Sequence, residues 1–178
     1  MKITLKDGSV KEYEHSMSVI DIAKDLSEGL ARVATSGRVN GELVDLRTVV
    51  DSDSEVEILT FDNEEGKGAF FHTTSHIMAQ AIKRLYPETK LAIGPSIENG
   101  FYYDVDPGEA TITAADFPTI EAKMLELASR KEPIVRKEIS KADALDRFGK
   151  RGEEYKVELI SELEDGTITT YTQGAFTD

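Results

Sequence analysis

Hydrophobic and polar residues alternate in short runs through residues 1–61, which predict a small β-rich domain. Apolar positions flank Asp7-Gly8, a strong two-residue hairpin signal. Ser18 is placed to cap one helix, and Gly29 lies near its expected end. Three extended segments follow, at Ala31 to Thr35, around a hairpin at Asn40-Gly41, and at Glu55 to Thr60. The order β-β-α-β-β-β predicts a β-grasp (ubiquitin-like) sheet that covers the helix.

The rest of the chain predicts a linker and then an α+β domain. Residues 62–69 are polar and Gly-containing and lack apolar periodicity, which is typical of a linker. Residues 70–178 predict a helix at about Phe70 to Tyr86, strands at Leu91 to Pro95 and Gly100 to Val105, a helix at Asp116 to Lys131, a strand at Ile134 to Ile139, helices at Ser140 to Phe148 and Glu153 to Leu163, and a strand at Thr167 to Tyr171. Because this domain stops at Asp178 without a cap or a polar tail, we expect it to be truncated at its C-terminal end.

Composition narrows the class of protein. With 39% hydrophobic residues the chain can bury a core, and no apolar run approaches the roughly 20 residues of a membrane helix. The chain has no cysteine and does not begin like a signal peptide, so we expect a cytoplasmic protein without disulfides or thiolate zinc. The formal charge, 21 − 34 = −13, argues against a general nucleic-acid binder. The one net-basic stretch, Lys123 to Lys156, leaves room for a local contact with one RNA end.

His72 and His76 are the main candidates for chemistry. Positions i and i+4 share one face of a helix, and the apolar stripe of this helix lies in a different sector, which weakens the interpretation as core histidines. Two interpretations stay open on spacing alone: a pair of solvated surface histidines, or a catalytic pair. A zinc site needs further ligands that the sequence does not place, so general-base or orienting work near pH 7 is favoured over metal binding.

Other candidates are weaker. Lys156 would serve as an electrophile or oxyanion partner, although a surface lysine on an amphipathic helix is the simpler interpretation. Gly94-Pro95 and Gly100 permit a close backbone approach. Tyr102 and Tyr103 point to opposite faces of their strand, so we expect one in the core and the other beside an opening.

Together these residues resemble the N-terminal region of bacterial threonyl-tRNA synthetases. The resemblance covers essentially the whole chain. It rests on the runs His72-Thr73-Thr74-Ser75-His76, Leu85-Tyr86-Pro87, Ile93 to Asp104, Glu154 to Ile160 and Gln173 to Asp178. The Gly94-to-Asp104 run joined to H-x-x-x-H at this distance is highly specific, whereas either part alone is weak. Residues 1–61 look like the TGS domain that precedes the editing domain in this family.

The resemblance implies an activity. The full enzyme joins threonine to its tRNA with ATP, and the region present here hydrolyses serine wrongly attached to that tRNA. Serine lacks one methyl group of threonine, and one methyl discriminates by roughly 1–3 kcal/mol, too little for accurate translation. A second pocket that accepts serine and excludes threonine supplies the remaining discrimination between the two amino acids.

The resemblance also implies site residues. His72 and Lys156 would polarise the ester or activate water, and His76, Tyr103 and Asp178 would position substrate and water, beside Gly94 and Pro95. The family continues after Asp178 with a Cys-x-x-x-His motif, so we expect this chain to be impaired in editing and unable to aminoacylate. We expect no metal or cofactor in it. The resemblance implies that ATP, Mg and a zinc ion bind to the catalytic core, which is absent here. It also implies that the parent enzyme forms a homodimer through domains that are absent here. The expected partner is the 3′ end of tRNA(Thr) carrying serine, with no membrane.

Two rival interpretations fit the sequence less well. A stand-alone trans-editing deacylase needs the complete motif and usually lacks a TGS domain, so residues 1–61 count against it. A TGS-containing regulatory or binding module would lack the His72/His76 and Gly94-to-Asp104 constellation, and no P-loop occurs in the sequence.

Overall fold

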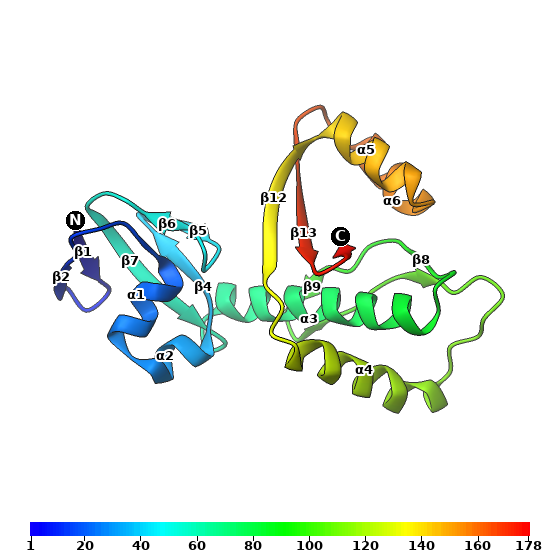
Figure 1. Ribbon diagram of the computed structural model, residues 1–178, viewed down its shortest axis with the longest axis horizontal. Coiled ribbons are helices and arrows are strands. Elements are labelled where there is room, and N and C mark those ends of the chain that lie inside the picture. The colour runs from blue at the N-terminus through cyan, green and yellow to red at the C-terminus, as the bar shows by residue number, and fades with distance from the viewer. The chain divides into compact units, whose positions relative to one another are not determined.

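The computed structural model describes residues 1–178 (Figure 1), which form two compact units, Met1–Phe71 and His72–Asp178. The first contains nine elements: β1 (Lys2–Leu5), β2 (Val10–Glu12), β3 (Met17–Ser18), α1 (Val19–Leu26), α2 (Glu28–Val33), β4 (Ala34–Val39), β5 (Glu42–Val44), β6 (Val49–Val50) and β7 (Ser54–Thr60).

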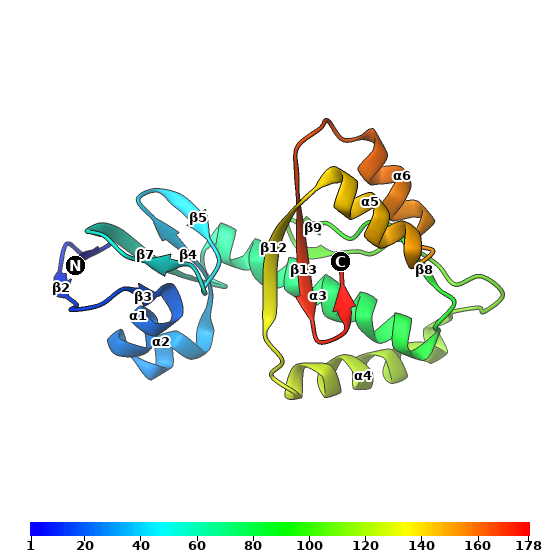
Figure 2. The same cartoon turned by 45° about the horizontal axis from the view of Figure 1, so that its top comes forward.

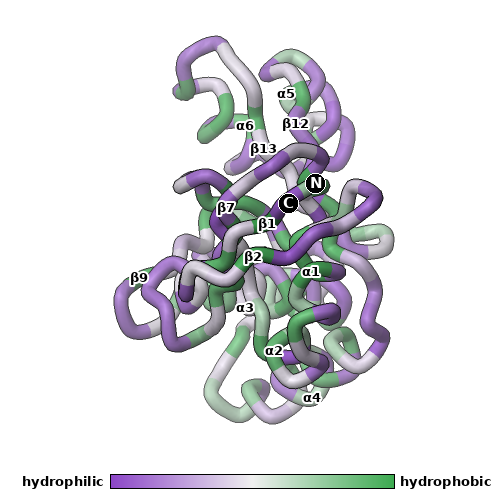
Figure 3. Tube along the Cα trace, turned by 90° about the vertical axis from the view of Figure 1, so that its left-hand side faces the viewer, coloured by the Kyte–Doolittle hydropathy of each residue, from purple (hydrophilic) through white to green (hydrophobic).

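The first unit is a mixed five-stranded sheet with the strand order β2-β1-β7-β4-β5. The chain's first strand and the last strand of this unit, β1 and β7, are parallel neighbours at its centre, and the two outer pairs are antiparallel hairpins. Residues from α1 and from the strands bury one core: Ile3, Val19, Ile22, Val50 and Val56. In Figure 3 hydrophobic and hydrophilic positions alternate along α1, as expected for a helix that covers a sheet. The predicted β-grasp fold is confirmed.

Both predicted hairpins of this unit are present, and the helical region differs from the prediction. Asn40 and Gly41 have φ of 50° and 87°, the conformation that a tight hairpin turn requires. The predicted single helix is in fact two, because the Ser27 side chain accepts hydrogen bonds from the backbone N–H groups of Gly29 and Leu30 and so starts α2. The segment predicted as extended from Ala31 is therefore helical up to Val33.

The remaining elements are α3 (Glu64–Leu85), β8 (Lys90–Leu91), β9 (Ser96–Ile97), β10 (Gly100–Phe101), β11 (Val105–Asp106), a 3-10 turn at Ala114–Asp116, α4 (Phe117–Ser129), β12 (Ile134–Ser140), α5 (Lys141–Lys150), α6 (Glu154–Glu162), β13 (Thr167–Gln173) and β14 (Phe176–Thr177). Helix α3 begins at Glu64 rather than at about Phe70, so most of the stretch predicted as a linker is helical. Glu64 and Glu65 stabilise its first turn by interacting with the positive end of the helix dipole.

The second unit is built around α3, a long β12–β13 ribbon and two further helix layers (Figures 1 and 2). Helices α3 and α4 bury Ala81, Ile82, Ile120 and Leu127 between them. Helices α5 and α6 pack together at the far end of the ribbon and bury Ala144, Phe148 and Ile160. With the first unit, this content confirms the predicted α+β class.

The predicted strands at Leu91 to Pro95 and Gly100 to Val105 are only partly formed. Pro95 has no N–H to donate to a ladder. The two segments are instead held by short pairs, β8 with β11 and β9 with β10, and by hydrogen bonds between Ala92 and Asp104 and between Ile93 and Asp104. The result is an irregular segment, 92–95, that lies along α3 and exposes backbone groups to a cavity of this unit.

Candidate functional site

A cavity of about 610 Å³ opens in the second unit beside α3 and the β12–β13 ribbon. The residues predicted as candidates are scattered between positions 72 and 178, and the fold brings seven of them to its wall. These are His72, His76, Gly94, Pro95, Tyr103, Lys156 and Asp178. Gly100 does not line the cavity. Tyr103 is the tyrosine beside the opening, but Tyr102, expected in the core, is 47% exposed.

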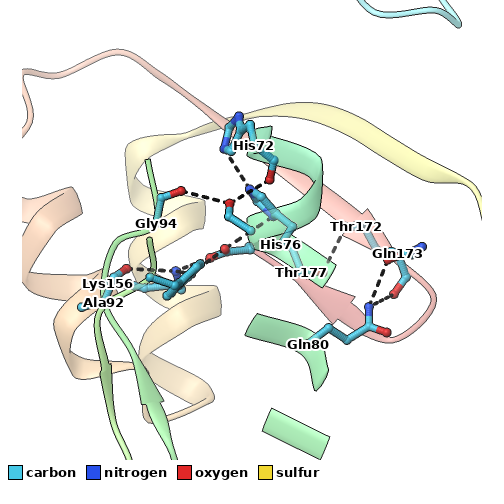
Figure 4. A network of polar contacts seen from close by, with 12 residues as sticks. His72, His76, Gln80, Ala92, Gly94, Lys156, Thr172, Gln173 and Thr177 are labelled. Atoms are coloured by element: carbon cyan, nitrogen blue, oxygen red, sulfur yellow. Dashed lines mark hydrogen bonds and ion pairs between the residues drawn. The ribbon is translucent and has the colours of Figure 1, made fainter. Parts of the chain in front are cut away.

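The histidine pair lies on one face of α3, as the helical spacing predicts (Figure 4). The Nε2 atoms of His72 and His76 are 2.9 Å apart, so only one hydrogen fits between them and one ring donates to the other. The Tyr171 ring packs edge-on against both imidazoles, with centroid distances of 5.9 and 5.8 Å. The side chain of His76 is 15% exposed, whereas His72 reaches solvent at the cavity mouth.

This environment keeps the histidine pair neutral. Burial lowers the pKa of His76 to about 4, although the nearby Asp178 carboxylate acts in the opposite direction. Burial also lowers the pKa of His72 below its ordinary value. At pH 7 each imidazole therefore has one unprotonated nitrogen; that of the accepting ring is engaged in the Nε2 contact, and that of the donating ring is able to accept a proton.

Lys156, Asp178 and Tyr103 form a second polar group on the cavity wall. The Lys156 ammonium is ion-paired with Asp178 Oδ1, donates to the Tyr103 hydroxyl at 2.9 Å, and contacts the Ala92 carbonyl oxygen at 3.2 Å. Tyr103 in turn donates to Asp178 Oδ2 at 2.6 Å. Asp178 Oδ2 also lies 3.4 Å from His76 Nδ1, so the carboxylate joins this group to the histidines.

The charges of this group follow from its contacts. Burial raises the pKa of Asp178, but Lys156, His76 and the Tyr103 hydroxyl outweigh it and leave that pKa below its ordinary value. Burial and the Asp178 carboxylate raise the pKa of Tyr103, which therefore stays a hydrogen-bond donor. The site thus holds an anion and an ammonium in a largely water-shielded corner.

Each of these side chains is positioned by a short piece of backbone. The turn at Gly174, with φ of 57°, folds β14 back on β13 so that Asp178 and Tyr171 exchange two backbone hydrogen bonds. Lys156 sits in the first turn of α6, shortly after Glu153. The buried Glu153 carboxylate forms an ion pair with Lys83 at 3.0 Å and accepts from the Leu91 N–H at 3.3 Å, which ties the start of α6 to α3 and to β8.

Gly94 and Ser75 fix that irregular segment against α3. Figure 4 shows Gly94 beside the turn of α3 that carries His72 and His76. The buried Ser75 hydroxyl bridges the carbonyl oxygens of His72 at 2.8 Å and Gly94 at 3.0 Å. A Cβ on Gly94 would lie 2.1 Å from the Tyr103 ring, so only glycine allows the tyrosine to reach Asp178. This confirms the close backbone approach predicted for Gly94, while a Cβ on Gly100 would meet nothing.

The sequence did not indicate the ribbon's contribution to the cavity. Arg136 from β12 and Thr169 and Tyr171 from β13 line the cavity, as does Ser96, which directly follows the irregular segment. Strand alternation alone places Thr169 and Tyr171 on one face, and Arg136 pairs with Tyr171 across the ribbon. Which face meets α3 depends on the tertiary packing, so this contribution was not readable from the strand pattern.

Comparison with known proteins agrees with this architecture. Residues 1–60 match the family model of the TGS domain. Over its whole length the chain is 57% identical to a threonine–tRNA ligase of Parabacteroides distasonis, 56% identical to that of Bacteroides thetaiotaomicron and 51% identical to that of Clostridioides difficile. The chain is a homologue of the threonine–tRNA ligases. It covers 27 to 28% of the length of these relatives, in their N-terminal regions.

This threonine–tRNA ligase homologue shows neither a metal centre nor a membrane helix. No group of three or more His, Cys, Asp or Glu side chains is arranged to hold a metal ion, so the His72–His76 pair lacks the third ligand that a zinc site requires. No helix is long and apolar enough to cross a membrane.

Proposed function

We propose that residues 72–178 hydrolyse serine wrongly esterified to the 3′ end of tRNA(Thr), as the editing part of a threonine–tRNA ligase. The observation that carries this proposal is one cavity in which a neutral histidine pair, an ammonium and a carboxylate converge from separate chain segments. Ester hydrolysis needs a base for water, a cation for the developing oxyanion and an anchor for the substrate.

Each residue has a role that its surroundings support. Neutral His72, at the cavity mouth, accepts a proton from the attacking water, and His76 holds its ring through the Nε2 contact. The Lys156 ammonium polarises the ester carbonyl. Asp178 contacts Lys156 through Oδ1 and Tyr103 through Oδ2, and a remaining lone pair of this carboxylate accepts from the cationic α-amino group of serine. Water's oxygen bonds to the carbonyl carbon, the ester C–O bond breaks, and the proton passes to the ribose oxygen.

The size of the polar corner favours serine. Tyr103 lies directly on the Gly94 backbone, and the Lys156 side chain closes the same corner against the Ala92 carbonyl. We propose that the amino-acid side chain lies in this corner, where an added methyl group would meet packed atoms, and overpacking of this kind costs typically about 1–3 kcal/mol. A steric filter for threonine is therefore consistent with the wall, and Gly94 and Pro95 form part of it.

For the longer protein, we propose the activity that its relatives' name states. Segments outside these residues attach threonine to tRNA with ATP and Mg²⁺, hold a zinc ion and form a homodimer, in the cytoplasm. The chain's own partner is the serine-bearing 3′ end of tRNA.

The test is hydrolysis of Ser-tRNA by a threonine–tRNA ligase that carries these residues. His72→Ala and Lys156→Ala are each expected to slow hydrolysis at least ~100-fold, because each removes a group used at the reacting carbonyl. Lys150→Ala is the control, since this exposed lysine lies on α5 and pairs with Asp146. Rates near those of the unmodified enzyme in His72→Ala or Lys156→Ala would overturn the assignment.

A further inference from the structure

One charged group on the cavity wall has no part in the proposed hydrolysis. Arg136 lines the cavity from β12, and Tyr171 lies between it and Asp178: Tyr171 pairs with Arg136 across the ribbon and exchanges backbone hydrogen bonds with Asp178. Lys156 is buried among Asp178, Tyr103 and the Ala92 carbonyl, and the proposed hydrolysis already uses its ammonium at the ester carbonyl. Arg136 is therefore the exposed cation of this wall, with 41% of its side chain accessible.

The position of Arg136 is fixed relative to the histidines. Its cross-strand partner in β12–β13 is Tyr171, whose ring packs on both His72 and His76. One of its Nη atoms contacts Thr169 Oγ1 at 3.3 Å, and Thr169 lines the same wall. Directly opposed strand residues have Cα atoms about 5 Å apart, so the guanidinium stands roughly one side chain beyond the hydrolytic groups.

The present contacts of the Arg136 guanidinium, with Glu138, Thr169 and Tyr171, leave it available to an anion. Its ion pair with Glu138, at 2.7 Å, joins two residues on the same strand whose side chains are 41% and 55% exposed. Exposed pairs of this kind are worth little, so exchange of the carboxylate for another anion costs little. A guanidinium presents a planar set of donors that matches a phosphate and stays charged at every accessible pH.

We propose that Arg136 binds the phosphate group of the 3′-terminal nucleotide, whose ribose carries the serine ester, and so positions the ester over His72 and Lys156. This inference rests on the proposed function and names the part of the tRNA that the cavity mouth recognises. It also accounts for how a chain of net charge −13 holds one end of a polyanion: a single local cation acts at the mouth of a cavity.

Two stable ligands allow the contribution of the phosphate to binding to be measured apart from that of the rest of the substrate. The first is 3′-amino-3′-deoxyadenosine with serine joined through an amide, which cannot be hydrolysed as an ester. The second is the same compound with a 5′-phosphate. The chain is expected to bind the phosphorylated ligand about tenfold more tightly, as for one charge-assisted hydrogen-bonded contact, and the preference is expected to shrink with added salt.

Three substitutions test which residue causes the preference. Arg136→Gln is expected to abolish it while changing affinity for the ligand without phosphate less than about twofold. Lys137→Gln is the matched control, because it removes a cation from the next position of β12, on the opposite face of the strand. Glu138→Gln removes the competing carboxylate and is expected to increase the preference, a gain that a merely structural role of Arg136 does not produce.

The outcomes separate the two proposals. If the ligand without phosphate binds normally but the phosphate adds nothing, or if Arg136→Gln keeps the full preference, the Arg136 assignment is wrong and the proposed function stands. The same holds if Lys137→Gln loses the preference equally. If neither seryl ligand binds better than 3′-amino-3′-deoxyadenosine alone, the proposed function fails, and the phosphate assignment fails with it.

Discussion

At the scale of single residues, the His72–His76 contact shows how a helix and a cavity wall set a protonation state. Two imidazoles with Nε2 atoms 2.9 Å apart share one hydrogen, and a second proton would force two N–H groups together. Burial adds to this cost, since it disfavours the charged form of His76. The pair is consequently poised as a base, and it remains one well below pH 7.

This protonation state predicts a pH dependence of stability. The pKa of His76 is about 4 in the folded chain against an ordinary value of 6.5, so between these pH values the unfolded chain binds one more proton. The free energy of unfolding should therefore fall as pH drops from 6.5 to 4, by about 3 kcal/mol from His76, with a smaller loss in the same direction from His72. Urea unfolding at a series of pH values across this window measures it.

The control for this prediction is the same titration in two variants. His76→Gln should flatten the dependence, whereas His15→Gln, which changes an exposed residue outside the second unit, should leave it unchanged. Asp178 does not contribute to the change in the free energy of unfolding between pH 6.5 and 4. Its pKa is lowered from 3.8, so its stabilising contribution is lost only below that range. An unaltered slope in His76→Gln would contradict the neutral buried histidine.

The sequence anticipated some of these residues from physics and others only from resemblance. Helical spacing identified His72 and His76, because i and i+4 share a face whatever the fold. Lys156 had no local signal, since a lysine on an amphipathic helix is usually solvated, and it gained meaning only from the family motif. Arg136 and Tyr171 were missed because the face that their strands turn to the cavity is decided by α3, far away in sequence.

At the scale of elements, the irregular segment 92–95 contributes more of the cavity lining than any regular strand. Its expected strand character is lost at Pro95, and it is held instead by the Ser75 hydroxyl and by contact with Tyr103. The helical region of the first unit was mispredicted for a similar reason. The Ser27 side chain caps α2 and so divides a segment that helix propensity alone predicted as one helix. Long periodic elements, α4 through β13, were predicted to within a few residues.

Gly94→Ala tests the role of this segment. The added Cβ would lie 2.1 Å from the Tyr103 ring, so the ring must move away from Lys156 and Asp178. We expect the rate of Ser-tRNA hydrolysis to fall at least ~10-fold, with the far-ultraviolet circular dichroism spectrum unchanged. Gly149→Ala is the matched control: a Cβ there, on α5, meets nothing within 4 Å and should slightly stabilise the helix. Equal activity of the two variants would contradict the packing argument.

At the scale of the whole molecule, the chain combines a TGS β-grasp unit with a second unit of different architecture that carries the cavity. The β-grasp fold of the first unit and the α+β class of the chain were predictable because each hydrophobic pattern is local. The linker predicted at residues 62–69 implies a break between them, and the continuous helix α3 shows that polar composition alone does not mark a break in secondary structure. The net charge of −13, by contrast, argues against nucleic-acid binding over the whole surface.

The central claim is that this cavity distinguishes serine from threonine on tRNA and hydrolyses only the former. The most direct measurement is the rate of deacylation of Ser-tRNA(Thr) and Thr-tRNA(Thr), side by side, by a threonine–tRNA ligase that carries these residues, with Lys156→Ala as the inactive reference. The account predicts that the serine ester is hydrolysed at least ~100-fold faster than the threonine ester, and that Lys156→Ala removes the difference. Equal rates for the two esters, or a selectivity that survives Lys156→Ala, would contradict it.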